Sequence, residues 1–127
     1  MDFSNYLANK LIDATVRNEP YETPVDVFLC LYTLNPTKED TGTEVREASY
    51  NRQDLKMSEP VDGVCENQSQ VDFATATSNW GLITHVGIRD QAYDGNLLYF
   101  TALDNPKEVL TGDQFKIDAD KLQITLT

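Results

Sequence analysis

The chain has 127 residues, a formal net charge of −11 and a sequence pI near 4.3. Its length suits one domain, which we expect to span residues 1–127. The excess of acidic side chains repels phosphate backbones and anionic lipid surfaces, so the composition disfavours nucleic-acid and membrane partners. Cys30 and Cys65 lie far apart without a C-x-x-C pattern, and we expect both to be free thiols.

Residues 1–18 are predicted to form an amphipathic helix. Its apolar positions at helical spacing are Phe3, Leu7, Leu11, Ile12, Ala14 and Val16. Asp2 is the expected N-cap, and Pro20 ends the helical pattern. We expect Phe3, Leu7 and Leu11 to be buried, within the protomer or between protomers, because each such side chain gains about 1.5–3 kcal/mol on burial.

The pattern changes to that of strands after Pro20. "VDVFLCLYT" is apolar at successive positions, which predicts a central strand covered on both faces. Further strands are predicted in "YNRQDLKMS", "QVDFATA", "GLITHVGIRD", "LLYFTAL", "NPKEVLTGD", "QFKIDA" and "LQITLT". About seven or eight short strands at regular spacing predict an all-β fold, an antiparallel β-sandwich of jelly-roll type over residues 25–127.

The stretches between these strands are predicted to be loops and turns. "NPTKEDTGTE" and "EPVDGVCENQS" are polar, "QAYDGN" carries an Asp-Gly-Asn turn signal, and Gly112-Asp113 predicts a second turn. Within "GLITHVGIRD", strict alternation would place Leu82, Thr84, Val86 and Ile88 on one face, with Ile83, His85 and Gly87 on the other.

The sequence offers little for catalysis or metal binding. His85 is the only histidine and lies mid-strand, away from any G-x-S-x-G motif, so we expect neither a catalyst nor a metal ligand there. If it were exposed, the acidic surroundings would raise its pKa. The acidic turns "KEDTGTE" and "DADK" lack the spacing of a calcium loop and are more often simply solvated. We expect no cofactor and no metal.

The order of motifs resembles that of small structural proteins of tailed bacteriophages, a family labelled as tail-fibre or minor virion proteins. The motifs are "SNYLANKLID", "VFLCLYTLNPT", "GTEV", "YNR", "VDFATATSNWG", "ITHVGIRD", "GNLLYF", "GDQFKI" and "LQITLT", in this order over nearly the whole chain. The segment "QDLKMSEPVDGVCENQ" departs from the family, which carries small residues there. A subunit contact made by this segment would therefore differ.

The resemblance implies a β-sandwich that assembles into the virion as an oligomer, without catalysis. It marks Trp80, Gly81, His85, Gly87 and Asp90 as positions that define the fold. In the motif "YNR", Tyr50 and Arg52 form a pair, and we expect Arg52 to bind a carboxylate through its planar fork. The structural or assembly candidates are therefore Phe3, Leu7, Leu11, Tyr50, Arg52, Trp80, Gly81, His85, Gly87 and Asp90.

Two functions from different classes remain open at this point. The first is a non-enzymatic virion component, made in the host cytoplasm, that contacts other virion proteins and itself. It would be a surface-exposed subunit of a tail fibre, baseplate or neck appendage, or a capsid-decorating (cement) protein. The alternative is a carbohydrate-binding module that contacts host surface glycans, with Trp80 and the tyrosines as rings that could stack on sugars.

Overall fold

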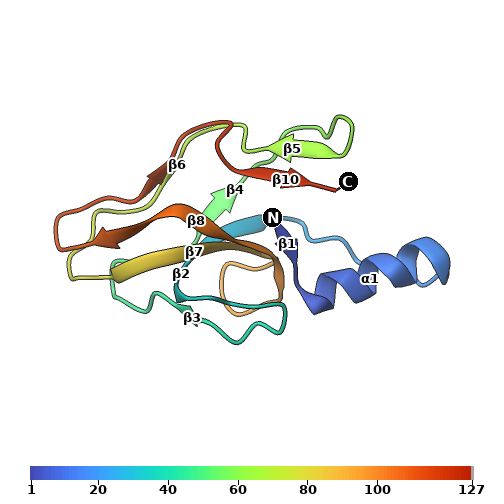
Figure 1. Cartoon of the computed structure of the whole chain (residues 1–127), viewed down its shortest axis with the longest axis horizontal. Helices are drawn as coiled ribbons and strands as arrows, with labels where there is room; N and C mark the ends of the chain where they lie inside the picture. Colours follow the sequence, from blue (N-terminus) through green and yellow to red (C-terminus); the bar gives the residue numbers. More distant parts are fainter. Residues whose placement is uncertain (127) are drawn as a thin grey trace.

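The computed structural model describes residues 1–126, in which antiparallel strands and a short N-terminal helix form the regular structure (Figure 1). The elements are β1 (Asp2–Phe3), α1 (Asn5–Val16), β2 (Val27–Leu34), β3 (Thr43–Glu44), β4 (Gln53–Leu55), β5 (Val64–Glu66), β6 (Val71–Asp72), β7 (Gly81–Arg89), β8 (Leu97–Val109), β9 (Lys116–Ile117) and β10 (Gln123–Thr125). The predicted all-β class with an N-terminal helix is confirmed.

The main sheet has the strand order β1-β8-β7-β2-β3, and β4 pairs with the first residues of β2. β2 is a central strand, as predicted. Its residues Leu29 to Tyr32 are all buried, because one face contacts the main core and the other contacts a smaller apolar cluster. Such burial on both faces explains why the sequence of β2 is continuously apolar rather than alternating.

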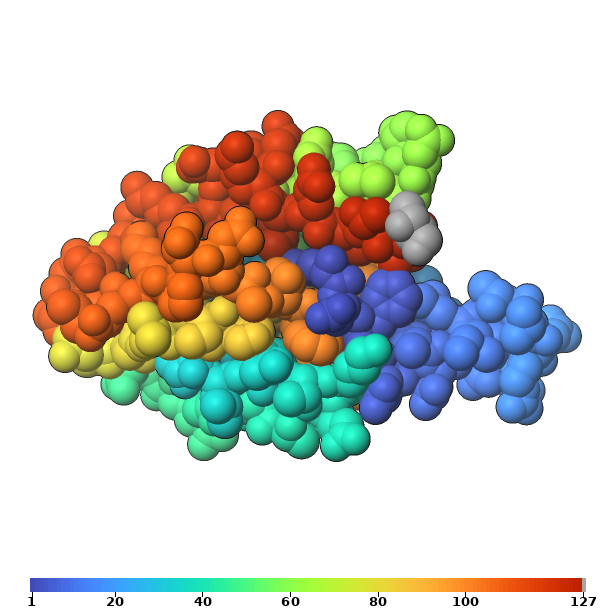
Figure 2. Space-filling model, in the orientation of Figure 1, coloured from blue at the N-terminus to red at the C-terminus, as the bar shows by residue number. Residues whose placement is uncertain are grey.

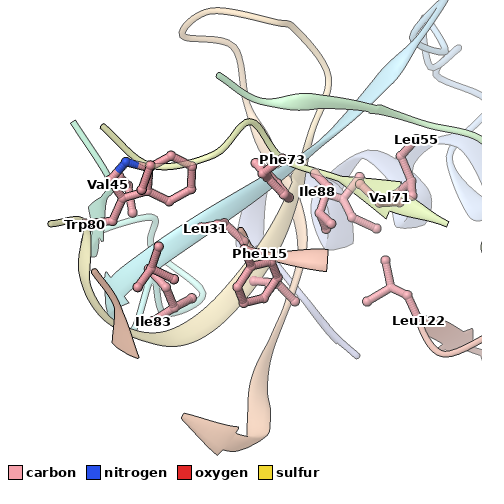
Figure 3. Close-up of a cluster of buried hydrophobic side chains, with 14 of the residues drawn as sticks. Leu31, Val45, Leu55, Val71, Phe73, Trp80, Ile83, Ile88, Phe115 and Leu122 are labelled. Atoms are coloured by element: carbon pink, nitrogen blue, oxygen red, sulfur yellow. The ribbon is translucent and has the colours of Figure 1, made fainter. Parts of the chain in front are cut away.

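Two small sheets, β5–β10 and β6–β9, form a second layer over one face of the main sheet (Figure 1). Side chains from both layers meet in the main core (Figure 3), which contains Leu29, Leu31, Val45, Leu55, Val71, Phe73, Ala76, Trp80, Ile83, Val86, Ile88, Val109, Phe115, Leu122 and Ile124. The two layers are compatible with the predicted sandwich, although the short strands of the second layer do not close it.

The opposite face of the main sheet carries the smaller cluster, formed by Cys30, Tyr32, Leu97 and Phe100. Gly87 makes this packing possible. A Cβ atom at Gly87 would lie 2.8 Å from Cε2 of Tyr32 and 3.0 Å from Cδ1 of Leu97. These distances are shorter than ordinary carbon contacts, so the Tyr32 ring occupies the space that a side chain at residue 87 would need.

The predicted alternation along β7 is wrong at its first residues. Ile83 belongs to the main core together with Val86 and Ile88, whereas Leu82 is exposed. The register shifts between Ile83 and His85, since Ile83 pairs with Lys107 while His85 pairs with Ala102. This bulge rotates the strand and moves Ile83 to the core face.

Two stretches predicted to be irregular contain short strands. β3 lies within "NPTKEDTGTE", and β5 lies within "EPVDGVCENQS". Conversely, the turn signals in "QAYDGN" and at Gly112 are correct. Asp94, Gly95 and Gly112 have φ angles of 54°, 72° and 92°, in the left-handed region that the Asp-Gly and Gly-Asp pairs favour.

The N-terminal helix begins later than predicted, so its expected N-cap, Asp2, is wrong. Asp2 and Phe3 form β1, which pairs with β8 at Phe100 and Tyr99. Ser4 is the N-cap: its Oγ accepts from the Leu7 amide at 3.1 Å and donates to the carbonyl of Leu97 at 2.5 Å. The start of α1 is therefore attached to the sheet through β1 and Ser4.

Candidate functional site

Arg52 and Glu44 form a bidentate ion pair between β3 and the segment before β4. Arg52 Nε donates to Glu44 Oε2 at 2.9 Å, and Nη2 donates to Oε1 at 2.8 Å. The structure thus supplies the carboxylate partner expected for Arg52. Burial opposes ionisation of Glu44, but the hydrogen bonds from Arg52 and Tyr50 outweigh it, so the pKa of Glu44 is lowered.

Tyr50 joins this ion pair to the main core. Its hydroxyl donates to Glu44 Oε2 at 2.5 Å and accepts from the Leu31 amide at 3.0 Å. Its ring stacks on Phe73 and meets Trp80 edge to face, with centroid distances of 6.0 Å and 5.5 Å. Burial is the largest cause that raises the pKa of Tyr50, so the phenol stays protonated.

Arg89 forms a second bidentate pair that the sequence analysis did not identify. Its Nη1 and Nη2 atoms each donate to a carboxylate oxygen of Asp40 at 2.8 Å, and Nη1 also donates to the Tyr32 hydroxyl at 3.1 Å. In the sequence, Arg89 is only a charged residue at the end of an apolar strand. This is a weak signal for an ion pair, because its partner Asp40 lies in a loop far away in the sequence. The guanidinium is largely buried, and it connects the loop of Asp40 to the turn after β7.

The turn between β7 and β8 is held by both arginines. Arg52 Nη1 donates to the carbonyls of Gln91 and Asp94, and Arg89 donates to those of Asp94 and Gly95. Within the turn, the Asp90 carboxylate accepts from the backbone and side-chain amides of Asn96 at 2.7 Å and 3.1 Å. Asp90 thus stabilises the turn that leads from β7 to β8.

A groove of about 560 Å³ lies beside this turn. It is lined by Glu44, Val45, Arg46, Glu47, Tyr50, Asn51, Arg52, Ala92, Tyr93 and Asp94. Tyr93 at its rim is 81% exposed, which is high for an aromatic side chain. The structure thus brings Tyr50 and Arg52 together here, together with Arg46, Asn51 and Tyr93, which were not among the candidates from the sequence.

Phe3, Leu7 and Leu11 gather at the other candidate region, the base of α1. Leu7 is buried, whereas Phe3 and Leu11 are half-buried. Of the three side chains expected to be buried, the chain itself therefore buries only Leu7 fully. Phe3 contacts Tyr99 edge to face at 5.5 Å. Leu7 and Leu11 line an apolar pocket of about 260 Å³.

The rest of α1 extends away from the sheets (Figures 1 and 2). Ile12 and Val16 are 55% and 76% exposed. They form a stripe of their own, since they are four residues apart and Ile12 is rotated about 100° from Leu11. The helix therefore presents two apolar side chains that residues 1–126 leave more than half exposed.

Trp80 and Gly81 have structural positions. Trp80 is only 4% exposed, and its Nε1 donates to Ser49 Oγ at 3.1 Å. It belongs to the core and has no free ring face to stack on a sugar (Figure 3). Gly81 has a φ of 94°, a conformation that side chains rarely adopt, at the start of β7.

His85 is half-buried on the face of the main sheet opposite the main core, between its register partners Tyr32 and Ala102. Its Nδ1 lies 2.8 Å from Thr84 Oγ1. Desolvation lowers the pKa of His85. The rise expected for an exposed histidine in acidic surroundings does not apply, because the ring is half-buried.

Residues 1–126 lack the features of a metal site and of a membrane-spanning helix. No three His, Cys, Asp or Glu side chains in this range are grouped as metal ligands would be. The helical part of the same range contains no segment with the length and hydropathy needed to span a membrane.

One protein family matches nearly the whole chain. The family model described as "Podophage GP4 fiber I protein gp80" matches residues 2–125. The chain belongs to this family. The resemblance to phage tail-fibre proteins is thus confirmed, and the chain is a structural virion component that associates with other virion proteins. No curated protein matches the chain.

Proposed function

We propose that the protein is a non-enzymatic, surface-exposed subunit of a phage tail-fibre appendage, and that it self-associates through α1. The fibre family, matched over residues 2–125, supports the appendage rather than the capsid-decorating alternative. The exposed apolar stripe on α1 is the observation that carries the self-association.

A helix as short as α1 gains little stability by itself, because isolated helices under about 12–15 residues are marginal in water. Its first turns are supported by β8 and Ser4, but the stripe of Ile12 and Val16 has no such support. Each of these side chains would gain about 1.5–3 kcal/mol on burial. Association therefore has a local driving force at this end of the molecule.

The charge of α1 also favours a second copy as the partner. Lys10, Arg17 and Asp13 give residues 5–17 a net charge of +1, while the whole chain carries −11, so the remaining residues carry −12. Two acidic subunits repel each other over most of their surfaces. Helix-to-helix contact brings together the segments where this repulsion is weakest.

Among the rings considered for the carbohydrate-binding alternative, Trp80 has no support in the geometry, because its indole is buried. The proposal that the protein is not an enzyme is supported by its fibre family and by the position of His85. Within residues 1–126, the only side chain that hydrogen-bonds to this ring is that of its neighbour, Thr84.

The test is the double variant Ile12→Gln, Val16→Gln. Glutamine has a helix propensity at least as high as isoleucine or valine, so α1 is retained while the stripe becomes polar. We expect sedimentation equilibrium to show the wild type as an oligomer and the variant as a monomer, with reduced incorporation into virions.

The matched control is Val61→Gln, which changes another exposed valine away from α1. It should leave both the oligomeric state and incorporation unchanged. A wild-type protein that is monomeric at all concentrations, or a double variant that still associates and is incorporated normally, would contradict the proposal.

A further inference from the structure

We propose that the groove beside the β7–β8 turn binds a neutral saccharide of one or two rings, with Tyr93 as the stacking surface. The proposal adds a ligand to the proposed fibre function. It rests on that function in one respect, because only a subunit on the virion surface meets host glycans on an intact phage. The binding itself is a property of the isolated protein and is testable without the virion.

The size of the groove matches this class of ligand. Its volume, about 560 Å³, falls within the range of roughly 300–1,000 Å³ common for small-molecule sites. The apolar face of a sugar ring packs on aromatic rings, and the exposed ring of Tyr93 is available for that contact. By contrast, Trp80 is buried in the core, and the hydroxyl of Tyr50 is bonded to Glu44, so neither ring is available to a ligand.

The groove also offers polar groups that the fold does not use. The guanidinium of Arg46, the side-chain amide of Asn51 and the hydroxyl of Tyr93 make no hydrogen bond or ion pair with any residue in 1–126, although other members of the lining do. Arg46 and Asn51 donate, and Asn51 also accepts. This mixture suits sugar hydroxyls, which both donate and accept.

The loop that carries Tyr93 is already ordered by side chains of the fold. Arg52 bonds to the carbonyls of Gln91 and Asp94, which flank Tyr93 on both sides. Arg52 is itself held by Glu44 at 2.8 Å and 2.9 Å. Binding to a preorganised loop loses little conformational entropy, so even a small ligand gains useful affinity. Arg52 is thus a positioning residue for Tyr93.

The charges of the groove favour a neutral ligand over an anionic one. Glu44, Glu47 and Asp94 carry three negative charges, and Arg46 and Arg52 carry two positive ones. Arg52 is occupied by Glu44, so Arg46 is the cation left for a ligand, and Glu47 and Asp94 line the same groove. A uronic acid or sialic acid would meet these two carboxylates.

The experiment uses the full chain and an array of neutral hexoses, 6-deoxyhexoses, N-acetylhexosamines and their disaccharides, with uronic and sialic acids as the anionic arm. The best binder is then followed by saturation-transfer NMR and calorimetry. We expect neutral sugars to bind and Tyr93→Ala to weaken the binding about tenfold, whereas Tyr93→Phe keeps it within about threefold.

Asn51→Ala should also weaken binding, and the matched control Asn105→Ala, an exposed asparagine outside the groove, should not. Absence of binding in the millimolar range, equal binding by Tyr93→Ala and wild type, or preference for anionic sugars would each overturn the proposal. None of these results bears on virion incorporation or on association through α1, so the two proposals fail separately.

Discussion

Arg52 and Arg89 donate to the same acceptor, the carbonyl oxygen of Asp94, at distances of 2.8 Å and 3.2 Å. Two like charges converge there because each guanidinium has its own carboxylate, Glu44 for Arg52 and Asp40 for Arg89. Their shared acceptor lies in the turn that carries Tyr93. The conformation of this turn therefore depends on two ion pairs from distant parts of the chain.

Replacement of Arg52 by lysine should destabilise the protein. A lysine ammonium cannot reproduce the planar fork to Glu44 together with the two bonds to the turn. We expect a loss of about 2 kcal/mol in the free energy of unfolding and a melting temperature lower by about 6–8 °C. Arg46→Lys, at an exposed arginine that forms no ion pair within residues 1–126, is the control, and equal melting temperatures for the two variants would refute the role of Arg52.

Glu44 should make stability depend on acidic pH. Its pKa is lower in the folded chain than the ordinary value of 4.5, so its contribution is complete above that pH and is lost as the pH falls through the folded pKa. Urea unfolding should show Glu44→Gln as less stable than wild type at neutral pH. This difference should shrink below pH 4.5, and a constant difference at all pH values would exclude the linkage.

Gly87→Ala should destabilise the main sheet. The new methyl group would lie 2.8 Å from the Tyr32 ring, whose hydroxyl is held by Arg89 and so has little freedom to move. Such overpacking costs about 1–3 kcal/mol. Chemical unfolding monitored by tryptophan fluorescence measures the change, and an unaltered midpoint would show that the ring adapts without cost.

His85→Gln should fold and assemble normally but lose a small pH dependence. Since the pKa of His85 is lower in the folded chain than its ordinary 6.5, the unfolded chain binds the proton more readily, and wild-type stability falls as the pH drops below about 6.5. Unfolding free energies of wild type and variant should therefore converge or cross on acidification. Loss of virion assembly in the variant would instead indicate that the histidine lies in a required contact.

Hydrophobic periodicity located the long strands because their burial leaves a local pattern. β2 is continuously apolar since it is covered on both faces, and its central position could be predicted. The faces of β7 could not, because the bulge arises where Ile83 and His85 pair with residues of β8 that are five positions apart in the chain, Lys107 and Ala102. Nothing in the local alternation of β7 encodes this shift.

The candidate site was predictable only in part for the same reason. Arg52 was identified because the motif "YNR" and the acidic composition pointed to a carboxylate partner. Arg89 was missed because its partner, Asp40, is 49 residues away, and Tyr93 was missed because the turn signal of "QAYDGN" predicts the bend of the chain but not the groove beside it. Contacts between distant loops depend on the assembled fold.

A cryo-electron microscopy map of the virion in which this subunit is located would test its place in the appendage and its association through α1 together. We predict density for the subunit in a tail appendage, with Ile12 and Val16 of α1 buried against a neighbouring copy. A map in which the subunit lies on the capsid, or in which α1 extends into solvent without a partner, would contradict the account.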